Sequence, residues 1–185
     1  MKPAIFFDRD GVLNVAPPPG GYVLSPEDLR LEAGAADAVR LARQAGYATM
    51  VATNQRCVGV GLITVDTLQA IHQRLQELLC EQGAAPGIDA IYYSADDRNS
   101  GSTTRKPAPG MLLQAAADHQ LDLSASWMIG DSLKDVGAAL AAGVRPILVE
   151  NPATAAERGD IPYEVRSRTV IVPSIEQAIQ HVLGY

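Results

Sequence analysis

Short apolar runs alternate along the chain with longer segments in which apolar residues recur at helical spacing. The apolar runs predict buried strands at residues 4–7, 47–52, 88–93, 127–129 and 146–149. The periodic segments predict helices at residues 35–45, 64–83, 109–119 and 132–142. Strands that alternate with helices in this way are typical of an α/β domain with a parallel sheet.

The C-terminal part of the chain is less regular. Residues 150–169 carry prolines and charges without a clear period, so we expect an irregular surface segment there. The run from Val170 to Val172 predicts an edge strand. Ser174 followed by Gln177 is a capping-box pattern, which predicts a last helix that ends near Leu183.

Composition and charge narrow the class of protein. With 185 residues, of which 47% are hydrophobic and 19% charged, we expect one globular domain over residues 1–185. The net charge of −6 disfavours non-specific binding to nucleic acid or to an anionic membrane, so we expect neither as a partner. Cys57 and Cys80 are too few for a disulfide framework, and we expect reduced thiols. Since no apolar run resembles a signal peptide or could span a bilayer, we expect a cytoplasmic protein.

Polar residues follow three of the predicted strands at the point where each strand ends. Asp8 follows the first strand, Thr53 the second and Asp131 the fourth. In an open parallel sheet, ligands bind in the crevice outside the carboxyl ends of the strands. The topology alone therefore predicts a site at this edge.

The pattern Asp8-Arg9-Asp10-Gly11 comes directly after the first predicted strand. Two carboxylates this close would repel each other in an empty pocket, and a divalent cation removes that repulsion. Hard oxygen ligands favour Mg²⁺. An ordinary Asp-Gly turn after a strand is the alternative, and this pattern alone does not decide between them.

Three further patterns carry candidate chemistry, and each has a structural alternative. Asp131 is placed to join the first two carboxylates around a metal, or it caps the helix that follows. Arg105 and Lys106 are two adjacent cations that could bind an anion, or they are an ordinary surface pair. Residues 53–55 offer uncharged donors for phosphate oxygens, or they form a turn that ends a strand.

Taken in order, these patterns resemble the motif set of the haloacid dehalogenase superfamily across nearly the whole chain. The set Asp-x-Asp, Thr-Asn, Lys-Pro and Gly-Asp-x-x-x-Asp stands here at residues 8–10, 53–54, 106–107 and 130–135. The run Arg-Lys-Pro-Ala-Pro-Gly-Met at residues 105–111 narrows the resemblance to the branch of heptose bisphosphate phosphatases and histidinol phosphatases. The resemblance implies a Rossmann-like three-layer α/β sandwich around a central parallel sheet. Predicted elements fill the spans between the motifs, so we expect no cap domain.

The resemblance also implies a Mg²⁺-dependent phosphomonoesterase that works through an aspartyl-phosphate. Asp8 is then the nucleophile, and Asp10 is the general acid and base. Asp8, Asp131 and the backbone carbonyl of Asp10 would bind Mg²⁺. Asp135 would orient Lys106 or a metal-bound water rather than bind the metal directly.

The other motif residues are expected to hold the substrate. Lys106 would neutralise charge on the phosphate oxygens, and Thr53 would donate a hydrogen bond to one of them. Further substrate contacts are expected from Asn54, Gln55, Arg56 and Arg105. The resemblance favours D-glycero-D-manno-heptose 1,7-bisphosphate as substrate, with loss of the 7-phosphate. Without a cap, selectivity would come from the loops at residues 15–22, 56–61 and 94–104.

The chain departs from the family pattern in the loop before Arg105. Many relatives bind a structural zinc there through Cys-x-His and Cys-x-Cys, and the corresponding positions here are Ser94, Asp96, Ser102 and Thr104. Three hydroxyls and one carboxylate are poor zinc ligands, so we expect no zinc and a hydrogen-bonded turn instead.

The second departure lies in the loop at residues 56–61. Relatives show Ser-Gly near its start and an arginine before its last glycine, whereas this chain has Arg56 at the start and Val60 before Gly61. Our hypothesis is that Arg56 supplies a relocated contact to the substrate. The three histidines, His72, His119 and His181, are expected to be ordinary surface or boundary residues.

Other functions stay open at this point. A phosphatase of the same fold could act on histidinol phosphate, on another small phosphomonoester or on a nucleic-acid 3′-phosphate, although the acidic charge argues against the last. A non-catalytic binding module is a different class, disfavoured because all the motif residues are present. We expect a small phosphorylated sugar as the partner and a monomeric protein.

Overall fold

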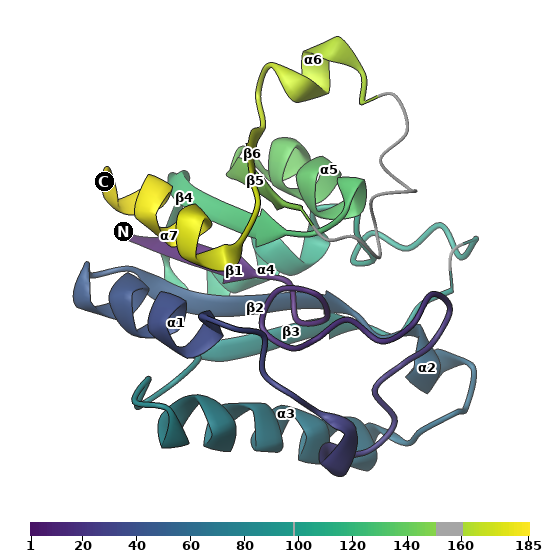
Figure 1. Cartoon of the computed structure of the whole chain (residues 1–185). Coiled ribbons are helices and arrows are strands. Elements are labelled where there is room, and N and C mark those ends of the chain that lie inside the picture. Colours follow the sequence, from purple (N-terminus) through teal and green to yellow (C-terminus); the bar gives the residue numbers. More distant parts are fainter. Residues whose placement is uncertain (98, 151–160) are drawn as a thin grey trace.

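The computed structural model describes residues 1–97, 99–150 and 161–185, and its centre is one six-stranded sheet (Figure 1). The strands are β1 (Lys2–Phe7), β2 (Ala48–Asn54), β3 (Ala90–Ser94), β4 (Leu121–Gly130), β5 (Arg145–Val149) and β6 (Val170–Val172). Neighbouring strands are all parallel, in the order β3-β2-β1-β4-β5-β6. The direction of the strand order reverses between β1 and β4, and parallel sheets bind ligands at such a reversal.

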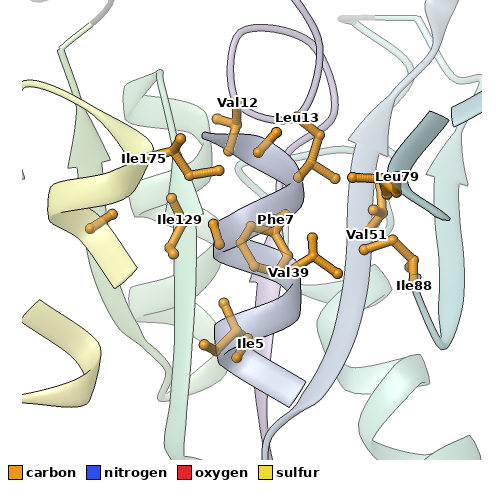
Figure 2. Close-up of a cluster of buried hydrophobic side chains, with 14 of the residues drawn as sticks. Ile5, Phe7, Val12, Leu13, Val39, Val51, Leu79, Ile88, Ile129 and Ile175 are labelled. Carbon is orange, nitrogen blue, oxygen red and sulfur yellow. The ribbon is translucent and has the colours of Figure 1, made fainter. Parts of the chain in front are cut away.

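Helices cover both faces of the sheet. The first face carries α1 (Ala35–Gln44), α3 (Val65–Glu81) and α7 (Ile175–Leu183), and the second carries α4 (Gly110–His119) and α5 (Leu133–Ala142). Alternate residues of β1 pack into the two hydrophobic cores, one on each face of the sheet, because successive side chains of a strand point to opposite faces. Phe7 belongs to the first core and Phe6 to the second. Figure 2 shows the first core, in which Phe7 lies among side chains of α1, β2 and β4.

These layers confirm the expected three-layer α/β sandwich. The predicted helix caps are also present: the side chain of Thr64 accepts a hydrogen bond from the backbone N–H of Thr67, and that of Ser174 accepts one from Gln177. Residues 8–34 and 55–64 contain η1 (Pro26–Asp28) and α2 (Arg56–Gly59) as their helical elements, so neither span holds a cap domain.

The largest difference from the predicted elements is β4, which was expected at residues 127–129 and begins at Leu121. The register between β1 and β4 shifts between Pro3 and Ile5. Ser126 bridges this irregularity, since its Oγ accepts from the backbone N–H of Ala4 at 2.8 Å and donates to the carbonyl of Asp122. Four of the six added residues, Asp122, Ser124, Ala125 and Ser126, are small or polar, so no continuous apolar run marks this part of the strand.

Three short helical elements were not predicted, because three or four residues are too few to show a periodic pattern of apolar positions. They are η1, α2 and α6 (Tyr163–Arg166), the last within the segment expected to be irregular. Residues 151–160 of that segment lie outside the described residues. The edge strand and the last helix are confirmed as β6 and α7. Cys57 and Cys80 are both free thiols, and among the described helices none has the length and hydrophobicity needed to cross a bilayer.

His72 corrects the expectation that all three histidines lie at the surface or its boundary. It is buried on α3, on the face that also buries Leu68 and Leu75. Burial, with a smaller contribution from the nearby Arg9 guanidinium, lowers the pKa of His72 to about 4. His72 is therefore a neutral core residue at neutral pH.

Leu75→Ala is expected to lower the free energy of unfolding by about 2–5 kcal/mol, because Leu75 is fully buried and its truncation leaves a cavity. Leu62→Ala is the matched control, since Leu62 is 55% exposed and its loss should change stability by less than about 0.5 kcal/mol. Denaturant unfolding of both variants measures the difference. Equal losses would contradict the packing described for α3.

Candidate active site

Three neighbouring strands end in polar side chains at one edge of the sheet. β1 leads into Asp8, β2 ends with Thr53 and Asn54, and β4 leads into Asp131. The backbone N–H of Asp8 donates to the carbonyl of Ile129 at 2.9 Å, so β1 and β4 stay paired up to the site. The polar residues that follow the strands therefore lie together, as predicted. They share one cavity of about 240 Å³, whose lining includes Asp8, Asp10, Thr53, Asn54, Arg105, Lys106 and Asp131.

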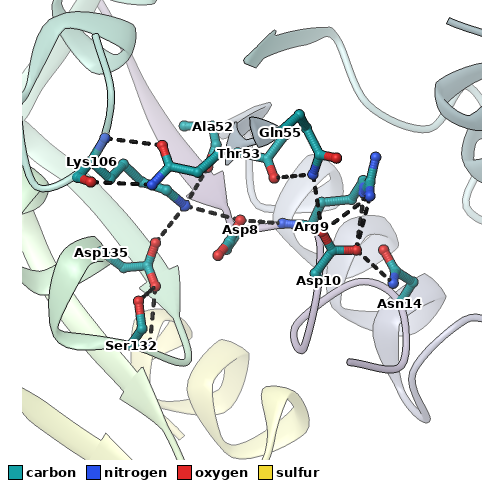
Figure 3. Close-up of polar contacts among 11 residues, drawn as sticks. Asp8, Arg9, Asp10, Asn14, Ala52, Thr53, Gln55, Lys106, Ser132 and Asp135 are labelled. Carbon is teal, nitrogen blue, oxygen red and sulfur yellow. Dashed lines mark hydrogen bonds and ion pairs between the residues drawn. The ribbon is translucent and has the colours of Figure 1, made fainter. Parts of the chain in front are cut away.

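Lys106 is the central cation of this site, and its side chain is only 2% exposed. Its Nζ donates to Asp8 Oδ1 at 2.9 Å, to Asp135 Oδ1 at 2.5 Å and to the Ala52 carbonyl at 2.7 Å (Figure 3). Asn54 fixes the backbone of Lys106, because its Nδ2 donates to the Lys106 carbonyl at 3.1 Å and its Oδ1 accepts from the Lys106 N–H at 3.0 Å. Burial opposes the charge, but the two carboxylates outweigh it and raise the pKa of Lys106.

Asp135 contacts Lys106, as the sequence suggested, and is itself fixed by the start of α5. Its Oδ2 accepts from the Ser132 N–H at 3.1 Å and from the Ser132 hydroxyl at 2.7 Å. Asp135 also packs against Gly130, where any Cβ atom would collide with the Asp135 side chain. Glycine at this position therefore permits the close approach that brings Asp135 to Lys106.

Asp10 lies in a different environment and is held by nitrogen donors. Arg9 donates from Nε to Oδ1 at 3.2 Å and from Nη2 to both carboxylate oxygens at 3.0 Å. Asn14 Nδ2 donates to Oδ1 at 3.0 Å, and Gln55 Nε2 donates to Oδ2 at 2.9 Å. Burial raises the pKa of Asp10, but the Arg9 charge and these hydrogen bonds outweigh it, so the pKa is lowered. Asp10 is thus held as a carboxylate.

Asp8, Asp131 and Asp135 bring carboxylate oxygens within 4.8 Å of one another. Burial, against the opposing charge of Lys106, raises the pKa of Asp8 to about 6. Burial and the neighbouring Asp8 and Asp135 raise the pKa of Asp131 to about 8. Crowded carboxylates of this kind are relieved by a divalent cation, and an all-oxygen donor set fits a hard ion such as Mg²⁺.

Two of the expected substrate contacts do not line the cavity. Gln55 is 1% exposed, and its Nε2 is used by Asp10 and by Thr53 Oγ1, the latter at 2.9 Å. Arg56 donates from Nε to Asp97 Oδ1 at 2.6 Å. The structure therefore places Gln55 behind the site, where it orients Asp10, and Arg56 at its margin.

One of the three loops expected to give selectivity contributes to the site, since residues 16–22 form part of the cavity wall. Lys134, which had no role assigned from the sequence, lines the cavity together with Arg105. Lys134 lies three residues after Asp131, a spacing that places it in the first turn of α5 beside the strand end. This spacing from Asp131 is what could have predicted Lys134 as a site residue. For Arg9, its position between Asp8 and Asp10 could have done so.

The four positions at which the family resemblance implied zinc ligands, residues 94, 96, 102 and 104, lie together. Asp96 Oδ2 accepts hydrogen bonds from the hydroxyls of Ser102, of Thr104 at 3.1 Å and of Ser94 at 3.2 Å. These bonds lower the pKa of Asp96. The expected hydrogen-bonded turn is confirmed, and the expectation that no zinc binds here stays a prediction.

Asp131→Asn is expected to stabilise the metal-free protein at pH 8 and to change it little at pH 4. An unfolded aspartate ionises near pH 4, whereas folded Asp131 keeps its proton up to about pH 8. The native state therefore binds more protons between these values, and stability falls as the pH rises. The asparagine amide does not ionise, so the variant does not lose this stability as the pH rises.

Thermal unfolding in a metal chelator at several pH values measures this effect. Asp66→Asn, at an exposed position on α3, is the control. A gain in Tm that does not grow between pH 4 and pH 8 would contradict the assignment.

Comparison with known proteins agrees with this geometry. The HAD-hydrolase-like family profile matches residues 103–178. The D-glycero-D-manno-heptose-1,7-bisphosphate 7-phosphatase of Thermosynechococcus vestitus is 42% identical over 159 residues, which cover 80% of this chain and 79% of that protein. The D-glycero-beta-D-manno-heptose-1,7-bisphosphate 7-phosphatase of Pseudomonas putida is 38% identical over 146 residues, covering 79% of this chain and 81% of the relative.

A solved structure extends the match to the full length. The D,D-heptose 1,7-bisphosphate phosphatase of B. bronchiseptica, complexed with magnesium and phosphate, superposes with a TM-score of 0.85 at 32% identity and covers 100% of this chain and 99% of its own. The chain therefore belongs to the haloacid dehalogenase-like hydrolases and is a phosphatase of the branch that contains the heptose-bisphosphate 7-phosphatases.

Proposed function

We propose that this phosphatase is Mg²⁺-dependent and removes the 7-phosphate of D-glycero-D-manno-heptose 1,7-bisphosphate in the cytoplasm. The observation that carries the proposal is the pairing of Asp8 with Lys106 in a cavity that Asp10 and Asp131 also line. The names of the relatives, and the magnesium and phosphate bound to the B. bronchiseptica protein, support the substrate and the cofactor.

In the first half of the proposed reaction, Asp8 attacks the phosphorus atom. Asp8 Oδ1 already accepts from Lys106 Nζ at 2.9 Å and from the Arg9 N–H at 2.7 Å, so we assign Oδ2 as the attacking oxygen. An oxygen–phosphorus bond forms to Asp8 as the bond between phosphorus and the sugar oxygen breaks. Asp10 is a carboxylate in the substrate-free site, so it has to take up a proton when the negatively charged phosphate binds beside it, and it then gives that proton to the leaving sugar oxygen.

In the second half, water hydrolyses the aspartyl-phosphate. Asp10 takes a proton from the attacking water, the bond between phosphorus and Asp8 breaks, and inorganic phosphate leaves. The donors on Asp10 from Arg9, Asn14 and Gln55 favour its carboxylate form, which is the form this half needs.

Phosphate binding falls to the residues around the cavity. Lys106 and the Thr53 hydroxyl are proposed to contact the oxygens of the transferred phosphate. The side chain of Asn54 is occupied by the backbone of Lys106, so it positions that lysine. Asp8, Asp131 and the Asp10 carbonyl are the proposed Mg²⁺ ligands, and the ion would screen the charge between Asp8 and the phosphate dianion.

Asp8→Asn is expected to reduce phosphate release by at least about 10³-fold, because the amide cannot act as the nucleophile. The measurement is phosphate release with Mg²⁺ from heptose 1,7-bisphosphate, histidinol phosphate, other sugar phosphates and a 3′-phosphorylated oligonucleotide. Asp66→Asn should match the unaltered protein. Equal turnover of every substrate would reject the proposed substrate, and turnover that survives in Asp8→Asn would reject the mechanism.

Mg²⁺ is expected to bind more tightly as the pH rises from 6 to 8. The raised pKa values of Asp8, about 6, and Asp131, about 8, mean that protons compete with the metal at lower pH. Calorimetric titration at pH 6, 7 and 8 gives the Kd, and repetition in buffers of different ionisation heat counts the protons released. Asp131→Asn should weaken binding and flatten the pH dependence. A Kd independent of pH would contradict the proposed ligands.

A further inference from the structure

The loop between β3 and α4 closes on the carboxylate of Asp96. Oδ2 of this residue accepts hydrogen bonds from three hydroxyl groups, those of Ser94 at 3.2 Å, of Thr104 at 3.1 Å and of Ser102. A hydroxyl group has one proton to donate, and a carboxylate oxygen can only accept. The charge of Asp96 therefore orients these hydroxyl groups, with their protons directed towards it.

Arg105 is linked to this cluster through its backbone and through its side chain. With its proton directed to Asp96, the Ser102 oxygen accepts from the backbone N–H of Arg105 at 3.0 Å and from that of Thr104 at 3.1 Å. Arg105 Nη1 donates to the backbone carbonyl of Asp96 at 2.8 Å. Asp96 therefore holds both ends of this arginine, one through Ser102 and the other directly.

The cluster is attached to regular structure on both sides. Ser94 ends β3, and its carbonyl accepts from the backbone N–H of Gln55, just after β2, at 2.7 Å. At the start of α4, the Gly110 N–H donates to the Thr103 carbonyl at 2.9 Å, and any Cβ atom on Gly110 would collide with that carbonyl oxygen. Asp96 thus joins the end of the sheet to the residues that lead into α4.

Arg105 and Lys106 both line the active-site cavity, but they are held in different ways. Asn54 fixes the backbone of Lys106, and the Ala52 carbonyl accepts from its Nζ, so the position of this lysine depends on β2. The position of Arg105 depends on the loop, where Asp96 is exposed. Water can replace exposed hydrogen bonds at little cost, so loss of the Asp96 carboxylate should release Arg105 without unfolding the protein or displacing Lys106.

We propose that Asp96 is a positioning residue, which orients the hydroxyl groups of the loop and thereby holds Arg105 at the cavity to donate to phosphate oxygens of the substrate. This inference rests on the proposed phosphatase function and names a determinant of its substrate recognition. Asp96 is not among the described residues that line the cavity, so it acts through Arg105. A guanidinium suits the contact, because its fixed, planar donors match phosphate oxygens.

Hydrogen–deuterium exchange tests the link between Asp96 and Arg105 in the substrate-free protein. Asp96→Ala is expected to raise exchange in residues 99–105, because the N–H groups of Thr104 and Arg105 lose an oriented acceptor. Asp96→Asn should raise it less, since an amide oxygen still accepts hydroxyl protons.

Asp122→Ala is the matched control for exchange. Asp122 also accepts from a hydroxyl and from backbone N–H groups, those of Ser124 and Ala125, but it lies near the start of β4, away from the site. This variant should leave exchange in residues 99–105 unaltered. Unchanged exchange there in Asp96→Ala would overturn the link, whatever the substrate proves to be.

Kinetics with heptose 1,7-bisphosphate test what the link does. Asp96→Ala should raise KM by about 3- to 10-fold with a smaller change in kcat, the cost of ordering one or two side chains on binding. Arg105→Ala should raise KM at least as much. The double variant should match Arg105→Ala, because a residue that acts through Arg105 has no effect once that side chain is removed. Asp96→Asn should lie between the unaltered protein and Asp96→Ala, and Asp122→Ala should leave KM unchanged.

Two kinetic results would overturn the proposal. If the increases in KM from Asp96→Ala and Arg105→Ala multiply in the double variant, Asp96 acts independently of Arg105. If Asp96→Ala leaves KM unchanged in an active enzyme, the link has no part in recognition. Failure of the unaltered protein to hydrolyse heptose 1,7-bisphosphate would instead reject the proposed function, and the exchange experiment would still decide whether Asp96 holds Arg105.

Discussion

One buried ammonium group holds the acidic side chains of this site in place. Lys106 Nζ contacts Asp8 and Asp135, and Asp131 lies beside them, so three carboxyl groups crowd together around this buried cation. Such an excess of negative charge is unfavourable in a poorly solvated environment. The position of Lys106 is fixed by β2, through the Ala52 carbonyl and the side chain of Asn54. The pairing of β2 with β1 thus sets the distance between Asp8 and Lys106.

Asp8 and Asp10 show how two nearby carboxylates acquire different properties. Asp8 has little besides Lys106 and a backbone N–H to stabilise its charge, and its pKa is raised to about 6. Asp10 receives donors from Arg9, Asn14 and Gln55, and its pKa is lowered. The two environments therefore shift the pKa values of neighbouring acids in opposite directions. The difference follows from one buried arginine whose guanidinium contacts the second acid.

The sequence predicts the place of the site better than its contacts. Asp8, Thr53 and Asp131 follow strands that are parallel and adjacent, and their meeting needs only the correct strand assignment. The role of Gln55 cannot be predicted from the strand assignment alone. The chain turns after β2 and directs the Gln55 side chain towards Asp10 instead of the cavity. Burial of His72 could have been foreseen, since it lies four residues after Leu68 and three before Leu75 on α3.

The exposed loops at the margin of the cavity are less constrained than the buried charged residues at its floor. At the floor, charges are buried, so the removal of one partner leaves another unpaired at high cost. At the margin, the exposed Asp96 accepts hydrogen bonds from Ser102 and Thr104, and Arg56 pairs with Asp97, all with access to water. Water can replace such contacts, so residue types there can change without unfolding the chain. Residue types are therefore more constrained at Asp8, Lys106 and Asp135 than in the loops that surround them.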